Sequence, residues 1–548
     1  MMLRLLITAF LSLTPAQIND DSFQQAVMRL SGASTLEELS ESELERYQSL
    51  SDHPLDLNSA SRSQLSSTGF FTPFQVASIL DYIRSDGDIC SVAELAAVPG
   101  IGLQLAKDLE YFFTFRPSGV LGAANKGSLY ADARMRQSVK NGRWTSAFKA
   151  SSSLDSRYGA ALAIKDGALT SGSLSYSGRV LSRVVAGNFS ARFGQGLLLW
   201  SGFSLSGFSG VSAFTRNASG LAPCSTFSPE SSFCGAAASV ELGHTSLSLA
   251  ADFQGVQLVN MNHLWKNTTA GVSAVHSPEG YWISGDFRSS IGKVTFSGEG
   301  ALDFASGGSA ALLAGVWNIA YGKKAALLAR AYSPSYSSPW AGAARSASKT
   351  SDEWGAAAGL QLPWLMVSLD AAWHPSKEEA QFKGILNLQK SFGAFTPSLK
   401  LSSRYRPQAA KEALRNDIRF DLDAAWGRLQ AHIRLNAVGC TGWGWLGYME
   451  AGWKGEAALW VRATVFGIDS WADRIYVYER DVPGSFSVPA YYGRGYALSL
   501  YAGWKELKLR LSTTRYPGSD KSPSWEVKLM IGMKSQNLRP MLSPMAGE

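Results

Sequence analysis

The sequence predicts a small all-α domain followed by a large antiparallel transmembrane β-barrel. Three observations support this fold class: a secretory-type apolar segment at the start, helical spacing of apolar residues up to about residue 118, and period-two alternation beyond it. Charged residues make up only 17% of the 548 residues, against about 25% in an ordinary soluble domain. The chain is also rich in glycine and aromatic residues, with 53 Gly, 17 Trp and 19 Tyr. This composition is typical of many short strands with one apolar face.

Residues 1–16 are predicted to be a secretory signal peptide. Arg4 supplies a short basic region, residues 5–13 an apolar core, and residues 14–16, Thr-Pro-Ala, a small-residue cleavage site. Nine apolar-rich residues are too few to span a bilayer as a helix, and no later stretch approaches 18 uninterrupted apolar residues. We therefore expect an exported chain without a helical membrane anchor.

Two helical segments are predicted ahead of the barrel. Residues 17–50 form an acidic lead with seven acids and two bases, and residues 51–118 carry eight acids and four bases. Their net charges of −5 and −4 give −9 together. Because the whole chain carries +7 and Arg4 one positive charge, residues 119–548 carry +15. The acids of the lead are concentrated in one short run: Glu37, Glu38, Glu41, Glu43 and Glu45.

The most specific motif of the chain lies in residues 95–106, Leu-Ala-Ala-Val-Pro-Gly-Ile-Gly-Leu-Gln-Leu-Ala. It fits the turn of a helix-hairpin-helix motif, in which glycines permit a tight bend and expose backbone N–H groups to a phosphate. Residues 56–82 have a similar order of short helix, turn and helix. Residues 54–113 therefore resemble the tandem helix-hairpin-helix domain of the competence DNA receptor ComEA, whose family binds DNA without sequence preference.

This resemblance implies that double-stranded DNA is a partner, contacted by the second turn through Pro99, Gly100, Ile101, Gly102 and Lys107. Two features of the residues argue against it. The first turn has Phe70 and Thr72 where the second has its two glycines, so its phosphate seat is predicted to be lost. Non-specific DNA affinity comes mainly from basic side chains, whereas the helical segments carry −9. A structural or protein-docking role for the domain is the favoured hypothesis.

Residues 119–548 are predicted to form an outer-membrane β-barrel. In residues 525–533 the odd positions are all apolar and the even ones mostly are not, and residues 365–373 and 459–465 alternate in the same way. A sheet survives in lipid only when it closes, because every edge N–H and C=O must be paired. We expect roughly 14–20 strands, with an even number favoured. A soluble exported β-protein that uses the helical domain as a binding module is the alternative.

The order of the parts is similar to a family of Bacteroidota outer-membrane proteins described as helix-hairpin-helix domain-containing proteins. Three stretches carry the likeness: residues 58–102, residues 192–203 (Arg-Phe-Gly-Gln-Gly-Leu-Leu-Leu-Trp-Ser-Gly-Phe), and residues 474–479 with their continuation to 489–493. The resemblance covers most of the chain beyond residue 16. It implies an architecture, with outer-membrane lipid around the barrel and a periplasmic helical domain, rather than an activity.

The residues around 473–494 are predicted to form a polar network in the lumen. Alternation would place Ile475 and Val477 against lipid and the Arg and Tyr side chains inside the barrel. Such a network either contacts an anion or polymer in the channel or, as we favour, stiffens the lumen. Its candidate members are Asp473, Arg474, Tyr476, Tyr478, Glu479, Arg480 and Arg494.

A long Ser/Gly/Phe-rich loop is predicted from about residue 202 to residue 232. Loops of this length usually have a function, and this one either folds into the lumen as a plug or lies mobile on the surface. It contains Cys224, with Cys234 just beyond it, and export would permit a disulfide between the two. The six His residues are scattered without ligand spacing, so no metal site is expected.

No catalytic motif stands out, and neither an enzymatic activity nor a cofactor is expected. The leading hypothesis is a non-enzymatic outer-membrane barrel that serves passage or assembly of a macromolecule or solute. A DNA-binding or DNA-uptake component of the cell envelope is the alternative. Because tethered charges of opposite sign attract, we further expect residues 17–118 to dock on a basic periplasmic rim or mouth of the barrel.

Overall fold

The computed structural model describes residues 20–52, 54–117, 129–154, 157–178, 180–202, 207–228, 232–320, 322–407, 412–518 and 522–538. The predicted signal peptide, residues 1–16, lies outside these residues. Among them, no helix is long and apolar enough to cross a membrane.

The N-terminal part, residues 20–117, is a helical domain with one apolar core of its own. The core runs from Val27 to Phe113 and includes buried Leu65, Ile79 and Phe112. The boundary predicted at residue 50 falls inside a helix, and the segments on both sides share this core. The helices are α2 (Asp20–Ser31), η1 (Leu36–Glu38), α3 (Glu41–Asp52), α4 (Arg62–Ser67), α5 (Pro73–Ser85), α6 (Val92–Ala97) and α7 (Gly102–Leu109), and β1 (Leu55–Asp56) pairs in parallel with β2 (Phe113–Thr114).

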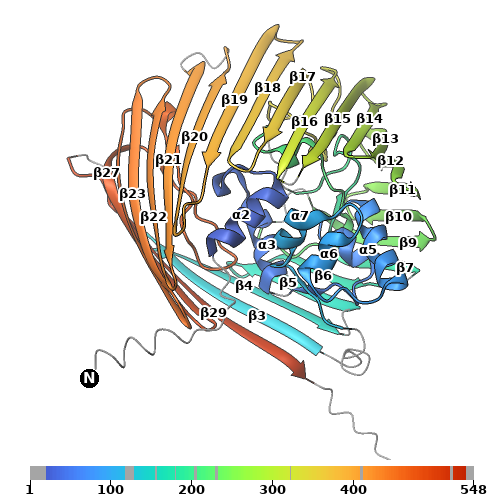
Figure 1. Cartoon of the computed structure of the whole chain (residues 1–548), viewed down its shortest axis with the longest axis horizontal. Helices are drawn as coiled ribbons and strands as arrows, with labels where there is room; N and C mark the ends of the chain where they lie inside the picture. The colour runs from blue at the N-terminus through green and yellow to red at the C-terminus, as the bar shows by residue number, and fades with distance from the viewer. Residues whose placement is uncertain are drawn as a thin grey trace, which may run out of the picture.

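The rest of the chain is a closed antiparallel β-barrel (Figure 1). Within the described residues, twenty-four strands form its wall, and β29 pairs with β3 to close it. The wall strands are β3 (Leu129–Lys140), β4 (Arg143–Leu154), β5 (Tyr158–Lys165), β6 (Ala168–Tyr176), β7 (Leu181–Arg192), β9 (Phe233–Leu242), β10 (Thr245–Asp252), β11 (Gln257–Trp265), β12 (Thr268–Ser277), β13 (Gly280–Ile291), β14 (Val294–Asp303), β15 (Gly308–Ala320), β16 (Lys323–Tyr332), β17 (Glu353–Gln361), β18 (Leu365–His374), β19 (Glu379–Gln389), β20 (Phe395–Tyr405), β21 (Leu414–Trp426), β22 (Leu429–Gly439), β23 (Trp443–Lys454), β24 (Ala457–Ile468), β27 (Gly493–Trp504), β28 (Leu507–Arg515) and β29 (Ser524–Leu538).

The fold class predicted from the sequence is confirmed, and the strand number is even, but the predicted 14–20 strands are too few. The reason is the composition of the missed strands. β6 reads Ala-Leu-Thr-Ser-Gly-Ser-Leu-Ser-Tyr and β17 reads Glu-Trp-Gly-Ala-Ala-Ala-Gly-Leu-Gln. Small residues on both faces give little period-two contrast, so these strands do not stand out in a pattern search.

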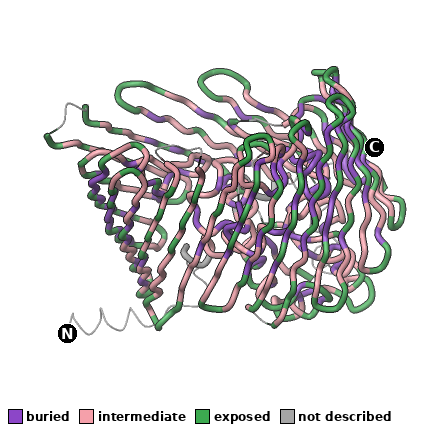
Figure 2. The backbone as a smooth tube through the Cα atoms, turned by 90° about the horizontal axis from the view of Figure 1, so that it is seen from above, coloured by how far each residue is buried: buried purple, intermediate pink, exposed green. Residues whose placement is uncertain are grey.

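The outer face of the wall is largely apolar, and the charged side chains of the strands are concentrated on the inner face. In β24 the exposed positions include Leu459, Val461 and Val465, whereas Arg462 and Thr464 between them are buried inside the barrel. β18 repeats the arrangement, with Leu369 and Trp373 outside and Asp370 and His374 inside. Figure 2 shows this alternation of buried and exposed residues along the strands. A soluble protein has the opposite distribution of apolar and charged residues.

The two ends of the barrel differ. At the end where β3 begins and β29 ends, the strands are joined by turns of two to five residues, such as 243–244 and 505–506. The other end carries three long connections, at 193–232, 333–352 and 469–492. These connections contain η2 (Val211–Phe214), β8 (Gly220–Pro223), η4 (Trp471–Asp473), β25 (Ile475–Tyr476) and β26 (Ala490–Tyr491).

One seam of the wall has little pairing. β6 and β7 share four residue pairs, from Ser173↔Gly187 to Tyr176↔Val184, whereas the other neighbouring wall strands share seven or more. Phe189 of β7 pairs with both β9 and β8, so β8 occupies the edge of β7 that β6 leaves. Beside it, the Ser171 hydroxyl of β6 donates to the Thr226 carbonyl at 2.8 Å.

The helical domain lies inside the barrel (Figure 1). This corrects the predicted position at a basic rim or mouth. The opposite net charges of the two parts predict that they attract, but not how deep inside the barrel the helical domain lies. The bases that face the domain are on the inner wall, near the middle of strands such as β4, β20 and β22.

Candidate functional site

The candidate site is the interface between the helical domain and the barrel wall. The run of five glutamates on η1 and α3, called here the acidic row, faces bases on six strands. We call these six the wall bases: Arg136 of β3, Lys149 of β4, Arg192 of β7, Lys400 of β20, Arg419 of β21 and Arg434 of β22. The ion pairs are Glu37 with Arg419 (3.3 Å) and Arg434 (2.6 Å), Glu38 with Lys400 (3.3 Å), Glu41 with Arg136 (4.0 Å), Glu43 with Arg192 (2.8 Å) and Glu45 with Lys149 (2.6 Å).

The helical geometry of α3 explains how a short run reaches distant parts of the wall. Glu41 and Glu45 are four residues apart and share one face of the helix, where they meet Arg136 and Lys149 on the neighbouring strands β3 and β4. Glu43, two residues from each, projects from another side of α3 and meets Arg192 at the end of β7. The row therefore connects the domain to several sectors of the wall at once.

Burial and guanidinium neighbours set the charge state of the row. Burial alone would raise the pKa of Glu43, but Arg46 and Arg192 lower it to about 2. Burial also opposes ionisation of Glu37, and Arg419 and Arg434 hold its pKa well below the usual range. Arg136, the base paired with Glu41, is more distant at 4.0 Å, and burial raises the pKa of Glu41. Glu37 and Glu43 are thus carboxylates at neutral pH.

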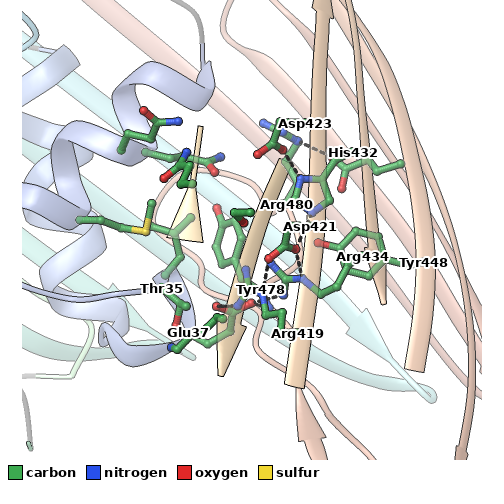
Figure 3. A pocket seen from close by; sticks show the side chains of 18 of the residues that line it. Thr35, Glu37, Arg419, Asp421, Asp423, His432, Arg434, Tyr448, Tyr478 and Arg480 are labelled. Atoms are coloured by element: carbon green, nitrogen blue, oxygen red, sulfur yellow. Dashed lines mark hydrogen bonds and ion pairs between the residues drawn. The ribbon is translucent and has the colours of Figure 1, made fainter. Parts of the chain in front are cut away.

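A cavity of about 130 Å³ lies beside Glu37, between the helical domain and strands β19–β24 (Figure 3). Asp421 organises its wall: Oδ1 accepts from Arg434 Nε at 2.6 Å and contacts His432 Nε2 at 3.1 Å, and Oδ2 accepts from Arg419 Nε at 2.5 Å. Arg419 and Arg434 are the two bases that also hold Glu37. A wall carboxylate thus orients the guanidiniums toward the helical domain.

The long connection 469–492 also folds into the barrel, and here a sequence prediction is wrong. Ile475 and Val477 do not face lipid; they are almost fully buried against Val438 and Phe466 on the inner wall. β25 pairs with β26 rather than with a wall strand. The alternation in this segment belongs to a strand inside the lumen, whose apolar side packs on an apolar patch of the wall.

Of the seven residues predicted to form a lumen network, three make hydrogen bonds or ion pairs inside the barrel. The Tyr478 backbone N–H donates to Glu37 Oε1 at 3.1 Å, Glu479 pairs with Arg510, and Arg480 donates to Glu450 at 3.0 Å. Glu450 also pairs with Arg462. The structure thus brings part of the predicted set together, in separate ion clusters rather than one.

The other four members lie elsewhere. Asp473 accepts N–H groups of Cys440 (2.9 Å) and Gly442 (3.1 Å), so it holds the β22–β23 turn. Arg474 donates to the Tyr476 hydroxyl at 2.9 Å in an exposed pair. The Arg494 side chain is 84% exposed and lies 3.7 Å from Asp469. These four residues lie at the end of the barrel that carries the long connections, away from the acidic row.

The described part of the loop predicted from residue 202 to residue 232, residues 207–228, lies inside the barrel, one of the two alternatives that the sequence left open. Phe208, Val211 and Phe214 pack on inward-facing residues of β15–β17. Asn217 Nδ2 donates to the Phe70 carbonyl of the helical domain at 3.2 Å. The loop therefore closes over the domain from the end with the long connections.

The two helical hairpins differ at their turns. The N-terminus of α5 is closed by a capping box between Thr72 and Gln75, and Phe70 is buried in the core. In the second turn Gly100 and Gly102 have positive φ of 84° and 74°, and α7 begins without a side-chain cap. Of the predicted contact residues, Pro99, Gly100, Gly102 and Lys107 are exposed and Ile101 is buried. DNA contact at this turn stays a prediction.

Both cysteines of the predicted disulfide are free thiols in the structure. Cys234 is exposed on the outer side of β9, between inward-facing Phe233 and Gly235. Cys224 follows β8 and lies beside Thr226, with Sγ 3.8 Å from the Thr226 hydroxyl. Among the described residues, no group of three or more His, Cys, Asp or Glu could hold a metal ion.

None of the six wall bases was predicted from the sequence. Their signal was present, because Arg434 stands between Ile433 and Leu435, and a charged residue at an inward position of an otherwise apolar strand marks a lumen contact. Alternation does not show which of these bases pair with the helical domain and which pair with acids of the wall.

No family model and no curated protein matches the sequence. Among solved structures, the chain is similar to the P pilus usher (PapC) translocation pore, with 8% identity over 74% of this chain and 99% of that chain at a TM-score of 0.38. It is similar to the siderophore receptor PirA from Pseudomonas aeruginosa, with 9% identity over 77% and 82% at 0.37, and to OccK3 (OpdO) from the same organism, with 8% over 74% and 96% at 0.29.

Proposed function

We propose that this chain is an outer-membrane β-barrel whose lumen is closed by its own N-terminal helical domain, and that it passes a macromolecule when that domain is displaced. The observation that carries the proposal is the helical domain held inside the barrel by the acidic row. The apolar exterior of the wall supports a membrane location, because residues such as Leu459, Val461 and Leu369 would otherwise face water. In barrels of this type the short turns are periplasmic, so the chain termini would lie on that side.

The kind of contact between domain and wall supports displacement. The domain has its own apolar core. Among the described residues outside the domain, the hydrophobic side chains packed against this core are Tyr478 and Phe486, which belong to the connection 469–492 and not to a wall strand. Its attachments to the wall are ion pairs and hydrogen bonds, including Ser63 Oγ to the Ser182 carbonyl (2.7 Å) and Arg183 to the Ser63 carbonyl (2.9 Å). A polar interface between domains is the kind that permits relative motion.

The size of the domain supports a large cargo. A compact domain of about 100 residues has a radius of gyration of about 13 Å. A lumen that accommodates such a domain, once emptied, is wide enough for a polymer chain. A small solute would not need an opening of that size.

Conductance across a planar bilayer tests this function. The wild-type chain should stay closed, whereas a release variant with Glu37, Glu38 and Glu43 changed to Gln should conduct, because it removes carboxylates from the interface. A control variant changes three exposed acids of the same domain, Asp81, Asp86 and Glu110, to the corresponding amides. Heat-modifiable gel mobility checks that each variant is folded. A release variant that is folded but remains closed would contradict the proposal.

DNA uptake is a second candidate, favoured by one observation. Gly102, the first residue of α7, is exposed, and the helix begins without a side-chain cap, an arrangement found where helix N-termini bind phosphate. Binding of duplex DNA by the full chain at about 150 mM salt, where the Debye length is roughly 8 Å, tests it. Micromolar binding that is lost in Gly100 and Gly102 variants would support DNA as the cargo.

A further inference from the structure

We infer that the acidic row occupies the binding surface of the cargo, and that the cargo is a polymer bearing carboxylates. The inference rests on the proposed passage function and names the substrate class for the same lumen. The wall bases would hold the row in the closed state and the cargo in the open state. Opening would then exchange one set of carboxylates for another.

Several inward-facing bases depend on the helical domain for their contacts. Among the described residues, the hydrogen-bond and ion-pair partners of Lys149 and Lys400 all belong to the domain: Glu45 for Lys149, and Ser34 and Glu38 for Lys400. The guanidinium of Arg183 donates to Ser63 and Ser67 of α4 and pairs with no acid of the described chain. When the domain leaves, these cations lose their partners and face the lumen.

The charge balance of the chain makes the emptied lumen attractive to anions. The chain beyond residue 118 carries +15, and the acidic row alone supplies five of the compensating negative charges. The exterior of the wall is largely apolar, so much of this excess is on the inner face and in the connections. A passage lined by one sign of charge with low-dielectric walls concentrates counter-ions.

The spacing of the charges favours carboxylates over the dense phosphates of a nucleic acid. The wall bases lie on six different strands between β3 and β22, so the wall fits separated negative charges. Acids remain beside bases of the inner wall, with Asp421 beside Arg434 and Glu450 beside Arg462. Duplex DNA carries one negative charge per roughly 1.7 Å of its axis, and such a strand would be repelled by these acids. Separated carboxylates can pass between them and still meet each guanidinium in a paired geometry.

The test measures ion selectivity and polymer block in the release variant Glu37→Gln, Glu38→Gln, Glu43→Gln of the full chain. The reversal potential in a salt gradient should show anion selectivity. Poly-glutamate and polygalacturonate should each block the current. With concentrations expressed as negative charges per volume, each polymer should block at a concentration at least ten-fold lower than a short DNA duplex. The more potent of the two polymers tells whether the carboxylates come from a peptide or a saccharide.

Wall variants connect the block to the named bases. In the release background, Lys149→Gln with Lys400→Gln should weaken the block by the carboxylate polymers about ten-fold. A matched pair, Lys293→Gln with Lys505→Gln, removes the same charge from turns at the short-turn end and should leave the block unchanged. Equal losses in both pairs would overturn the assignment to the lumen.

If the release variant does not fold, hydrogen exchange of the wild-type chain replaces it. Poly-glutamate or polygalacturonate should speed exchange in α3 by competing for the wall bases, and duplex DNA should not. Cation selectivity, stronger block by duplex, or unchanged exchange would each overturn the inference. A folded release variant without conductance would instead contradict the passage function itself.

Discussion

Glu43 of α3 and Arg192 at the end of β7 form an ion pair of 2.8 Å inside the barrel, and Arg46 holds the other carboxylate oxygen of Glu43 at the same distance. Arg46 also donates to the Thr68 carbonyl at 2.5 Å. One carboxylate therefore joins the barrel wall to the fold of the helical domain. A disturbance of this pair affects both the interior of the domain and its attachment.

Replacing Glu43 with Gln should loosen α3. Removing one partner of a buried ion pair leaves the other charge uncompensated, which costs about 3 kcal/mol. In hydrogen exchange by local opening, this corresponds to roughly a 100-fold faster rate in α3. Glu110→Gln, at an exposed position of the same domain, is the control and should leave the rate unchanged. Unaltered protection of α3 in the Glu43 variant would show that the pair does not hold the domain.

Acid should release the helical domain only well below neutral pH. The pKa of Glu43 is lowered from its ordinary value near 4.5 to about 2, so its contribution to stability is fully present above pH 4.5 and is lost as the pH falls toward 2. Glu37 acts in the same direction. Glu41 acts in the opposite direction, because its raised pKa makes protonation favour the folded state. Conductance or α3 exchange should stay constant from pH 8 to 5 and rise below about pH 4; a rise that begins near pH 6 would contradict the assignment.

The β6–β7 seam should be the least protected part of the wall. Backbone groups of β6 from Ala168 to Gly172 have no ladder partner on β7, and the Gly172 N–H donates instead to Asn188 Oδ1 at 2.9 Å. Amides on that edge of β6 should exchange at least about ten-fold faster than those between β12 and β13, which share ten residue pairs. Asn188→Ala should speed exchange at Gly172 further. Equal protection of both seams would refute this.

The two glycines of the second hairpin turn should tolerate alanine unequally. Both have positive φ, which costs an L-residue about 1–2 kcal/mol. A Cβ at Gly100 would also lie 3.0 Å from the Phe74 ring, whereas a Cβ at Gly102 would meet nothing within 4 Å. Thermal unfolding and exchange in α6 and α7 should therefore show a larger loss for Gly100→Ala than for Gly102→Ala. The reverse order would show that packing against Phe74 does not limit this turn.

The sequence predicts those parts of the structure that are set by local patterns, and not those that are set by contacts between distant residues. Local alternation decides the strands, and β29 with its alternating Val527, Leu529 and Ile531 was predicted from its pattern. The lumen segment at Ile475 was misassigned because an apolar face on the inner wall and one on lipid have the same pattern. The acidic row was visible as a run of glutamates, but its partners are spread over strands from β3 to β22. Pairing between such distant residues is set by the closed barrel, which no local pattern encodes.

The attachment of the helical domain to strands on both sides of the barrel also constrains the order in which the chain folds. Glu45 meets Lys149 across 104 residues, whereas Glu37 meets Arg434 across 397. A wall that had already closed would have to admit the folded domain through the end with the short turns, where β3 begins, and the domain would then have to form ion pairs with strands on both sides of the lumen. The simpler order has the helical domain, which is synthesised first and has its own core, fold before the barrel, with the strands wrapping around it as they pair. Contacts of such long sequence separation form slowly. The domain would then be a template for barrel closure, and a chain without it should form the barrel more slowly or with errors in strand pairing.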